Sequence, residues 1–409
     1  MEDQLRKAIA GYEAEMTEFT KRLIEVPTEN PPGTAYRACV DLIAGKLAEI
    51  GLECTLVEVP ADRPGKTRGD GDGLPGYCLL SSYGAGEDVL YFHGHYDVVP
   101  ASSREQFQPR VGKGNLFGRG SSDMKSGLAA MIAAVKAIKA CGIELRGKIG
   151  LTIVPDEETG GWRGSRYLQE AGLLGPHGIG MLTPEPTGGV VWNANRGAIS
   201  LRVTVKGKPA HVGLHYRGVN AFEGMLTVAD ALFDLKREVM ERHTRFNITP
   251  EAARASILMM GGQCAGGTNF NLVPGECAFT VDRRINPEED LAVEKQRLLE
   301  LFGRLRQQGV ELEVEILQEA PSAGVDDGDP VAVALARSIE TVTGERATFE
   351  MCPGLLENRW YAQHGVPAFA YGPGLLTVSH GPHEFVPLKN IPACALIYAL
   401  TAVRLLGPS

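Results

Sequence analysis

An apolar stretch from Lys148 to Pro155 constrains the fold of this chain more than any other feature of its sequence. Its hydrophobic residues follow one another with little alternation, which is typical of a strand buried on both faces of a largely parallel sheet. Strand-like runs at 77–81 and 89–93 precede it, and a helical run of small residues at 127–135 separates it from them. This order of strand, helix and strand predicts an α/β layer whose sheet is flanked by helices.

The pattern changes after residue 193. Residues 199–206 alternate between apolar and polar side chains, as a half-exposed antiparallel strand does. The elements that follow have the order strand, helix, strand, strand, helix, strand, which indicates a small α+β sandwich. A chain of 409 residues also exceeds what one hydrophobic core usually organises. We therefore expect one domain from residues 1–192 plus 319–409, interrupted by an inserted α+β domain at 193–318.

Composition and charge limit the classes of partner. The formal net charge is −9 and Lys and Arg do not cluster, so the basic surface that nucleic-acid binding needs is missing. The sequence has no secretory signal and no apolar run of roughly 18 residues that would span a membrane. The eight cysteines are scattered without a Cys-x-x-Cys pair, as in proteins of a reducing compartment. We expect a cytoplasmic protein that acts on a small molecule, without nucleic acid or membrane as a partner.

Five segments each place a metal-binding or proton-transferring side chain at the end of an expected strand or in the loop after it. Ligand-binding residues gather at that edge in open α/β sheets. The segments are YFHGHYD at 91–97, GRGSSDMKSG at 118–127, PDEETGG at 155–161, LTPEPT at 182–187 and SHGPHEF at 379–385.

Each segment alone leaves an ordinary structural alternative open. A neutral imidazole such as that of His95 is a good zinc ligand, and Asp97 can accept its other ring N–H. Asp123 directly precedes an expected helix, so it is equally typical of an N-cap. The three consecutive acids at 156–158 repel one another unless a cation lies beside them, although a solvated acidic turn has the same pattern.

The order of the five segments along the chain resembles one large family of metallopeptidases and deacylases. That family includes acetylornithine deacetylase, succinyl-diaminopimelate desuccinylase, aminoacylase and glutamate carboxypeptidase-type enzymes. The resemblance covers about residues 10 to 400, and the set of five motifs is far more specific than any one of them. It implies a catalytic domain with an inserted lid or dimerisation domain, and a homodimer.

The resemblance also implies a centre of two divalent metal ions. Zinc is the first expectation, and cobalt or manganese would accept the same His and carboxylate ligands. His95 and Glu185 would bind one metal, Glu158 and His380 would bind the other, and Asp123 would bridge the two. The peptide bond after that Asp is usually cis in the family.

Further roles follow from the matched positions. Asp97 would orient His95, and Glu157 would be the general base that takes a proton from water. His211 would donate to the negative oxygen of the intermediate, commonly in the active site of the partner subunit. Asn271 would hydrogen-bond the reacting group, and Arg284 would pair with a substrate carboxylate.

Three departures argue against a direct transfer of the specificity of any relative. His383 stands where family members often have Asn, and His215 where many have Pro. The segment 354–360 reads GLLENRW and places Arg359 and Trp360 near the expected pocket, where Arg359 would contact substrate.

We expect hydrolysis of the amide bond of an N-acyl amino acid or a related small compound by metal-activated water. A dipeptidase or aminopeptidase on the same site is one alternative, and it would require a free α-amino group. An amidohydrolase acting on a non-standard substrate, such as an aromatic amide, is another. A metal-binding protein without catalysis is the fourth reading, and the complete set of ligands with Glu157 argues against it.

Overall fold

The computed structural model describes residues 1–61 and 74–407 and divides into two compact units. The first unit comprises 1–193, 325–349 and the residues from Trp360 on, and the second comprises 194–324 and 350–359. Within the described residues, no helix is long and apolar enough to cross a membrane.

The second unit differs from the expected insertion in its later boundaries. It continues to Gly324, and it includes 350–359, which we had assigned to the other domain. Met351 packs in a small apolar cluster with Phe246 and Ile248, and its backbone N–H donates to the carbonyl of Asn247 at 2.6 Å. These contacts join segments about 100 residues apart, so no local pattern could reveal them.

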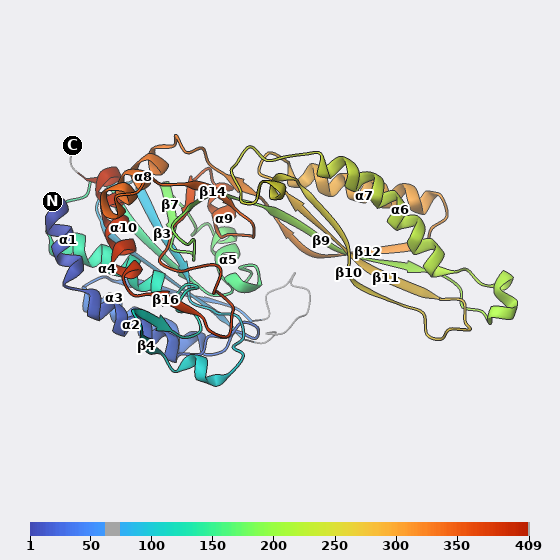
Figure 1. Cartoon of the computed structure of the whole chain (residues 1–409), viewed down its shortest axis with the longest axis horizontal. Coiled ribbons are helices and arrows are strands. Elements are labelled where there is room, and N and C mark those ends of the chain that lie inside the picture. Colours follow the sequence, from blue (N-terminus) through green and yellow to red (C-terminus); the bar gives the residue numbers. More distant parts are fainter. Residues whose placement is uncertain (62–73, 408–409) are drawn as a thin grey trace. The chain divides into compact units, whose positions relative to one another are not determined.

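A nine-stranded mixed sheet dominates the first unit (Figure 1). Its path is β1-β2-β6-β3-β7-β15-β8-β13, with β14 paired to β8. The central pairs β6–β3, β3–β7 and β7–β15 are parallel, whereas β1–β2, β2–β6 and β8–β13 are antiparallel. The predicted α/β class with an additional sheet domain is therefore confirmed. The strands are β1 Cys54–Val59, β2 Gly76–Gly84, β3 Val89–His95, β6 Lys148–Val154, β7 Gly178–Thr183, β8 Val191–Asn195, β13 Ala323–Gly324, β14 Phe349–Cys352 and β15 Ala368–Ala370.

Helices flank this sheet. The small side chains of α4 allow close packing, so this helix is buried over almost its whole length against α2, α10 and β3. A separate three-stranded sheet, β16-β5-β4, lies in the same unit. The bounds are α1 Glu2–Ala10, α2 Glu13–Glu25, α3 Tyr36–Glu49, α4 Lys125–Ala140, α5 Ser165–Glu170, α8 Pro330–Thr343, α9 Asn358–Ala362, α10 Asn390–Leu406, β4 Arg110–Gly112, β5 Asn115–Phe117 and β16 Phe385–Pro387.

The second unit is an antiparallel four-stranded sheet of order β10-β11-β9-β12 with two long helices on one side (Figure 1). Alternate residues such as Leu201, Val203 and Val281 face the helices and form its core. The chain order β9-α6-β10-β11-α7-β12 is the one expected from the sequence. The bounds are β9 Gly197–Lys206, α6 Ala221–Met240, β10 Ile257–Gly266, β11 Glu276–Ile285, α7 Leu291–Gln307 and β12 Leu312–Ala320.

Candidate metal centre

Three neighbouring parallel strands carry the candidate site at one edge of the large sheet. β3 ends at His95, which lies opposite Val154 at the end of β6, and the acidic loop begins two residues later. β7 ends at Thr183, two residues before Glu185. Because the carboxyl ends of parallel strands share one edge, side chains far apart in sequence meet there.

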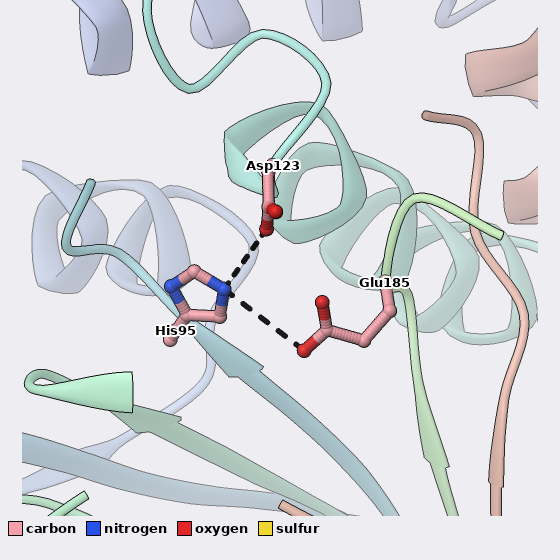
Figure 2. A group of neighbouring side chains, drawn as sticks. All are labelled: His95, Asp123 and Glu185. Atoms are coloured by element: carbon pink, nitrogen blue, oxygen red, sulfur yellow. Dashed lines mark hydrogen bonds and ion pairs between the residues drawn. The ribbon is translucent and has the colours of Figure 1, made fainter. Parts of the chain in front are cut away.

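His95, Asp123 and Glu185 form a buried triplet at this edge. The Nε2 atom of His95 lies 3.2 Å from Oδ1 of Asp123 and 3.9 Å from Oε1 of Glu185. Figure 2 shows the three side chains pointing toward one another. One ligand atom of each residue lies within 4.8 Å of the ligand atoms of the other two. One imidazole and two carboxylates at this spacing can hold a divalent cation.

A second triplet shares Asp123. The Nε2 atom of His380 lies 3.3 Å from Oδ2 of Asp123 and 3.2 Å from Oε1 of Glu158. Asp123 therefore faces His95 with one oxygen and His380 with the other, which is the geometry of a bridging carboxylate. The peptide bond between Asp123 and Met124 is cis, as the resemblance implies.

The charges of the two triplets fit metal ions. Burial opposes ionisation of Asp123, but hydrogen bonds from His380 and His95 outweigh it and lower the pKa of Asp123. Burial raises the pKa of Glu158, and hydrogen bonds to Asp123 and Glu158 raise the pKa of His380 to about 10. Burial alone would lower the pKa of His95, but hydrogen bonds to Asp123 and Asp97 raise it. The carboxylates thus favour positive charge beside them, which divalent cations with nitrogen and oxygen ligands supply.

Asp97 fixes both His95 and the acidic loop. Its Oδ1 lies 3.3 Å from Nδ1 of His95, which leaves Nε2 free to face the triplet. The backbone N–H groups of Glu157 and Glu158 donate to the two oxygens of Asp97, each at 3.2 Å. Asn30 donates to Oδ2 at 2.8 Å. The position of the loop that carries Glu157 is therefore tied to the same carboxylate that orients His95.

The three consecutive acids have separate environments. Asp156 is buried, adopts the left-handed conformation at φ 72°, and forms an ion pair with Arg163 at 3.0 Å. Glu158 faces the second triplet, and the side chain of Glu157 is half-buried. Arg163 therefore balances the charge of Asp156, and the expected need for a metal cation applies only to the other two acids.

Sequence reasoning missed three residues around the site. Asn30 received no role, although it directly precedes two prolines. Arg119 and Glu384 were inside quoted motifs but received no role. In the structure both are buried and form an ion pair at 2.7 Å.

His211 and Asn271 meet in the second unit. His211 forms a β-bridge with Leu272, and the N–H of Val212 donates to the carbonyl of Asn271 at 2.9 Å. His211 is exposed, and its Nδ1 accepts the N–H of Gly213 at 3.1 Å.

The two predicted substrate-binding arginines both contact acidic groups or carbonyls of this chain. Arg284 forms a bidentate pair with Asp282, with distances of 2.8 Å and 3.0 Å. Arg359 is only 1% exposed, donates to the carbonyl of Leu356 at 2.5 Å and lies 3.5 Å from the carboxylate of Glu357. Each guanidinium contacts groups close in sequence, so residue type and position alone did not reveal its partner.

Comparison with known proteins agrees with the geometry. Residues 91–404 match Peptidase family M20/M25/M40. N-formyl-4-amino-5-aminomethyl-2-methylpyrimidine deformylase of Bacillus subtilis (strain 168) is 25% identical over 425 residues, covering 95% of this chain and 93% of that protein. Succinyl-diaminopimelate desuccinylase of Alkalilimnicola ehrlichii is 27% identical over 382 residues, covering 90% and 94%. The solved structure of the di-peptidase Dug1p from Saccharomyces cerevisiae has a TM-score of 0.76 at 16% identity, covering 99% of this chain and 98% of that chain.

The family match takes in all five motif segments, so the resemblance inferred from the motifs is confirmed. The reaction class predicted from them is confirmed as well. The chain therefore belongs to Peptidase family M20/M25/M40 and is a metal-dependent hydrolase of amide bonds.

Proposed function

We propose that this enzyme removes the acyl group from a small N-acyl amine at a centre of two divalent metal ions, with zinc as the first choice. The observation that carries the proposal is the sharing of Asp123 between two triplets. His95, Asp123 and Glu185 would hold one ion, and Asp123, Glu158 and His380 the other. Bound there, such ions lower the pKa of water and polarise a carbonyl.

Glu157 is the proposed general base. Its carboxylate would take a proton from the attacking water and later deliver it to the leaving nitrogen. The placement of Glu157 directly before Glu158, with its backbone held by Asp97, supports this role. Asp97 would keep the hydrogen of His95 on Nδ1, so that Nε2 stays available as a ligand.

His211 is the proposed donor to the substrate oxygen. Because Nδ1 accepts the N–H of Gly213, the neutral ring carries its hydrogen on Nε2 and can donate it. Such a donor stabilises the charge that develops on the carbonyl oxygen during attack. Asn271, on the neighbouring segment, would hydrogen-bond the same group.

The acyl amine is preferred over a dipeptide for two reasons. The deformylase and the desuccinylase remove, by their names, a formyl and a succinyl group, and both align over at least 90% of this chain. The pairing of Arg284 with Asp282 also weakens the case for a carboxylate clamp. An N-acyl amino acid and an aromatic N-acyl amine both remain within the proposal. The similarity to the Dug1p fold keeps a dipeptide as the second candidate.

We further propose that the enzyme is a cytoplasmic homodimer that contacts its partner through the second unit. Helix α6 exposes Phe222, Leu226 and Phe233 on one stripe, and the adjacent edge strand β10 exposes Met259. An apolar stripe next to an unpaired strand edge is typical of a protein interface. The scattered cysteines support a reducing compartment.

Amine release from a panel of substrates tests the proposed reaction. The panel contains N-formyl, N-acetyl, N-succinyl and N-aromatic-acyl amino acids, N-acyl aromatic amines and free dipeptides, each with chelator and with added zinc or manganese. Chelator-sensitive release from one N-acyl class, restored by metal, is the expected result. Turnover of dipeptides alone would select the second candidate, and activity that survives complete metal removal would contradict the proposed centre.

A further inference from the structure

The three-stranded sheet β16-β5-β4 brings two of the motifs together beside the candidate metal centre. Phe117 at the end of β5 is the register partner of Phe385 at the start of β16. The residues just outside the pairing are therefore neighbours, and the N–H of Gly118 donates to the carbonyl of Glu384 at 3.1 Å. This register places Arg119 beside Glu384, although the two are 265 residues apart.

Arg119 and Glu384 form a buried ion pair. Nη1 of Arg119 lies 2.7 Å from Oε2 of Glu384, and the two side chains are 2% and 0% exposed. Neither residue belongs to the two triplets. Each charge depends on the other, because removal of one partner leaves the second buried and uncompensated.

Other polar atoms of the pair hold the backbone of two proposed metal ligands. The second oxygen of Glu384, Oε1, accepts the N–H groups of Ser122 at 2.9 Å and Asp123 at 3.1 Å. Nη2 of Arg119 donates to the carbonyl of His380 at 3.2 Å. The ion pair thus anchors the backbone of Asp123 through Glu384 and the backbone of His380 through Arg119.

The backbone of His380 needs such an anchor. Its φ of 63° lies in the left-handed region, which residues with a side chain rarely adopt. Arg119 also donates to the carbonyl of Gly381 at 3.3 Å, and Gln106 donates to that carbonyl at 3.1 Å. The carbonyls of His380 and Gly381 are therefore both fixed while the imidazole points to Asp123 and Glu158.

We infer that Arg119 and Glu384 are positioning residues that set the separation of Asp123 and His380, and with it the affinity of the metal site that these two form with Glu158. The inference rests on the proposed two-metal centre. His95 and Glu185 follow the ends of β3 and β7, and the ion pair contacts neither of their backbones in the hydrogen bonds of the described chain. Loss of the pair should therefore weaken the His380 site more than the His95 site.

Titration of metal-free protein with Mn²⁺ or Zn²⁺ tests the inference. Wild type should bind two equivalents. Glu384→Gln keeps the shape of the side chain but cannot accept from Arg119 and from both N–H groups at once. We expect one of its two equivalents to bind about 10- to 100-fold more weakly, as when other supports of metal ligands are removed, and the other, which also uses Asp123, to be weakened less. Excess metal should restore much of kcat, which a general loss of folding would not allow.

Glu294→Gln is the matched control. Glu294 is also buried and paired with arginine, Arg283, at 2.9 Å, but it lies in the second unit. The Glu294→Gln variant should bind both equivalents of metal as wild type does, even if its urea unfolding midpoint falls.

Arg119→Lys is the second test variant. It keeps the charge opposite Glu384, but one ammonium group cannot reach Glu384 and the carbonyls of His380 and Gly381 together. Arg119→Lys should lower the affinity for the same metal equivalent as Glu384→Gln does.

The outcomes separate the two proposals. If wild type does not bind two equivalents, the proposed centre fails. If wild type binds two and a folded Glu384→Gln or Arg119→Lys variant binds both with wild-type affinity, the positioning role is overturned. If neither variant folds, the ion pair is needed for folding and not for metal placement, and the positioning role is overturned as well.

Discussion

Replacement of Asp97 by asparagine probes how one carboxylate supports the whole centre. Oδ1 of Asp97 faces Nδ1 of His95 and the N–H of Glu157, and Oδ2 accepts from Glu158 and Asn30. An asparagine amide must turn its NH₂ group toward one of these pairs, so the N–H of either Glu157 or Glu158 loses its acceptor, whereas Nδ1 of His95 keeps the backbone carbonyl of Asp97 at 3.0 Å and Asn30 keeps the hydroxyl of Thr159 at 3.0 Å. At about 1–3 kcal/mol for one unsatisfied donor, the variant should lose about 1–3 kcal/mol.

Urea unfolding of metal-free protein measures this loss, which is a large part of the total stability of about 5–15 kcal/mol typical of natural proteins. Asp41→Asn is the matched control, because Asp41 is exposed and pairs with Arg37 one helical turn away. It should change stability by less than about 1 kcal/mol. With saturating metal, Asp97→Asn should also lose about 10- to 100-fold in kcat through misplaced ligands. Wild-type unfolding together with wild-type kcat in Asp97→Asn would refute the reasoning.

Three further predictions address the base, the interface and the second unit. Glu157→Gln should bind both metals normally while kcat falls about 10²- to 10⁴-fold; near-wild-type turnover would identify another base. Leu226→Glu should shift the sedimentation coefficient toward that of a monomer, whereas Val333→Glu, an exposed apolar site on α8, should not; a monomeric wild type would rule out the proposed interface. Burial alone would raise the pKa of Glu294, but hydrogen bonds from arginines outweigh it and lower that pKa below its usual value of about 4.3. Its stabilising effect is therefore fully present above about pH 4.3 and is lost as pH falls through the lowered pKa, so Glu294→Gln should lower the urea midpoint more at pH 7 than at pH 3; an equal effect at both pH values would contradict this.

The triplets could be predicted because each ligand follows a local signal. His95 is the last residue of an apolar strand and Glu185 follows another by two residues, and parallel strands end at a common edge. The identity of the atoms that meet across that edge still required the family resemblance, since no spacing rule brings His380 to Asp123.

The supporting contacts could not be predicted, because they join distant segments. Asn30 and Asp97 are 67 residues apart, and Arg119 and Glu384 are 265 apart. A motif gives a residue type but not its partners, so the pairing of Arg284 with Asp282 could not be predicted from the motif that contains both.

The pairing of β8 with β13 has an evolutionary consequence. Ala194 and Asn195 are register partners of Gly324 and Ala323, so the chain leaves for the second unit and returns from it along two adjacent strands. In the large sheet, β8 and β13 form a hairpin, and the 127 residues or so between them are its connecting loop. Hairpin loops accept insertion and exchange at little cost. Mutation can therefore reshape the segment that carries the proposed substrate contacts His211 and Asn271, while the strand ends that carry His95 and Glu185 are left untouched.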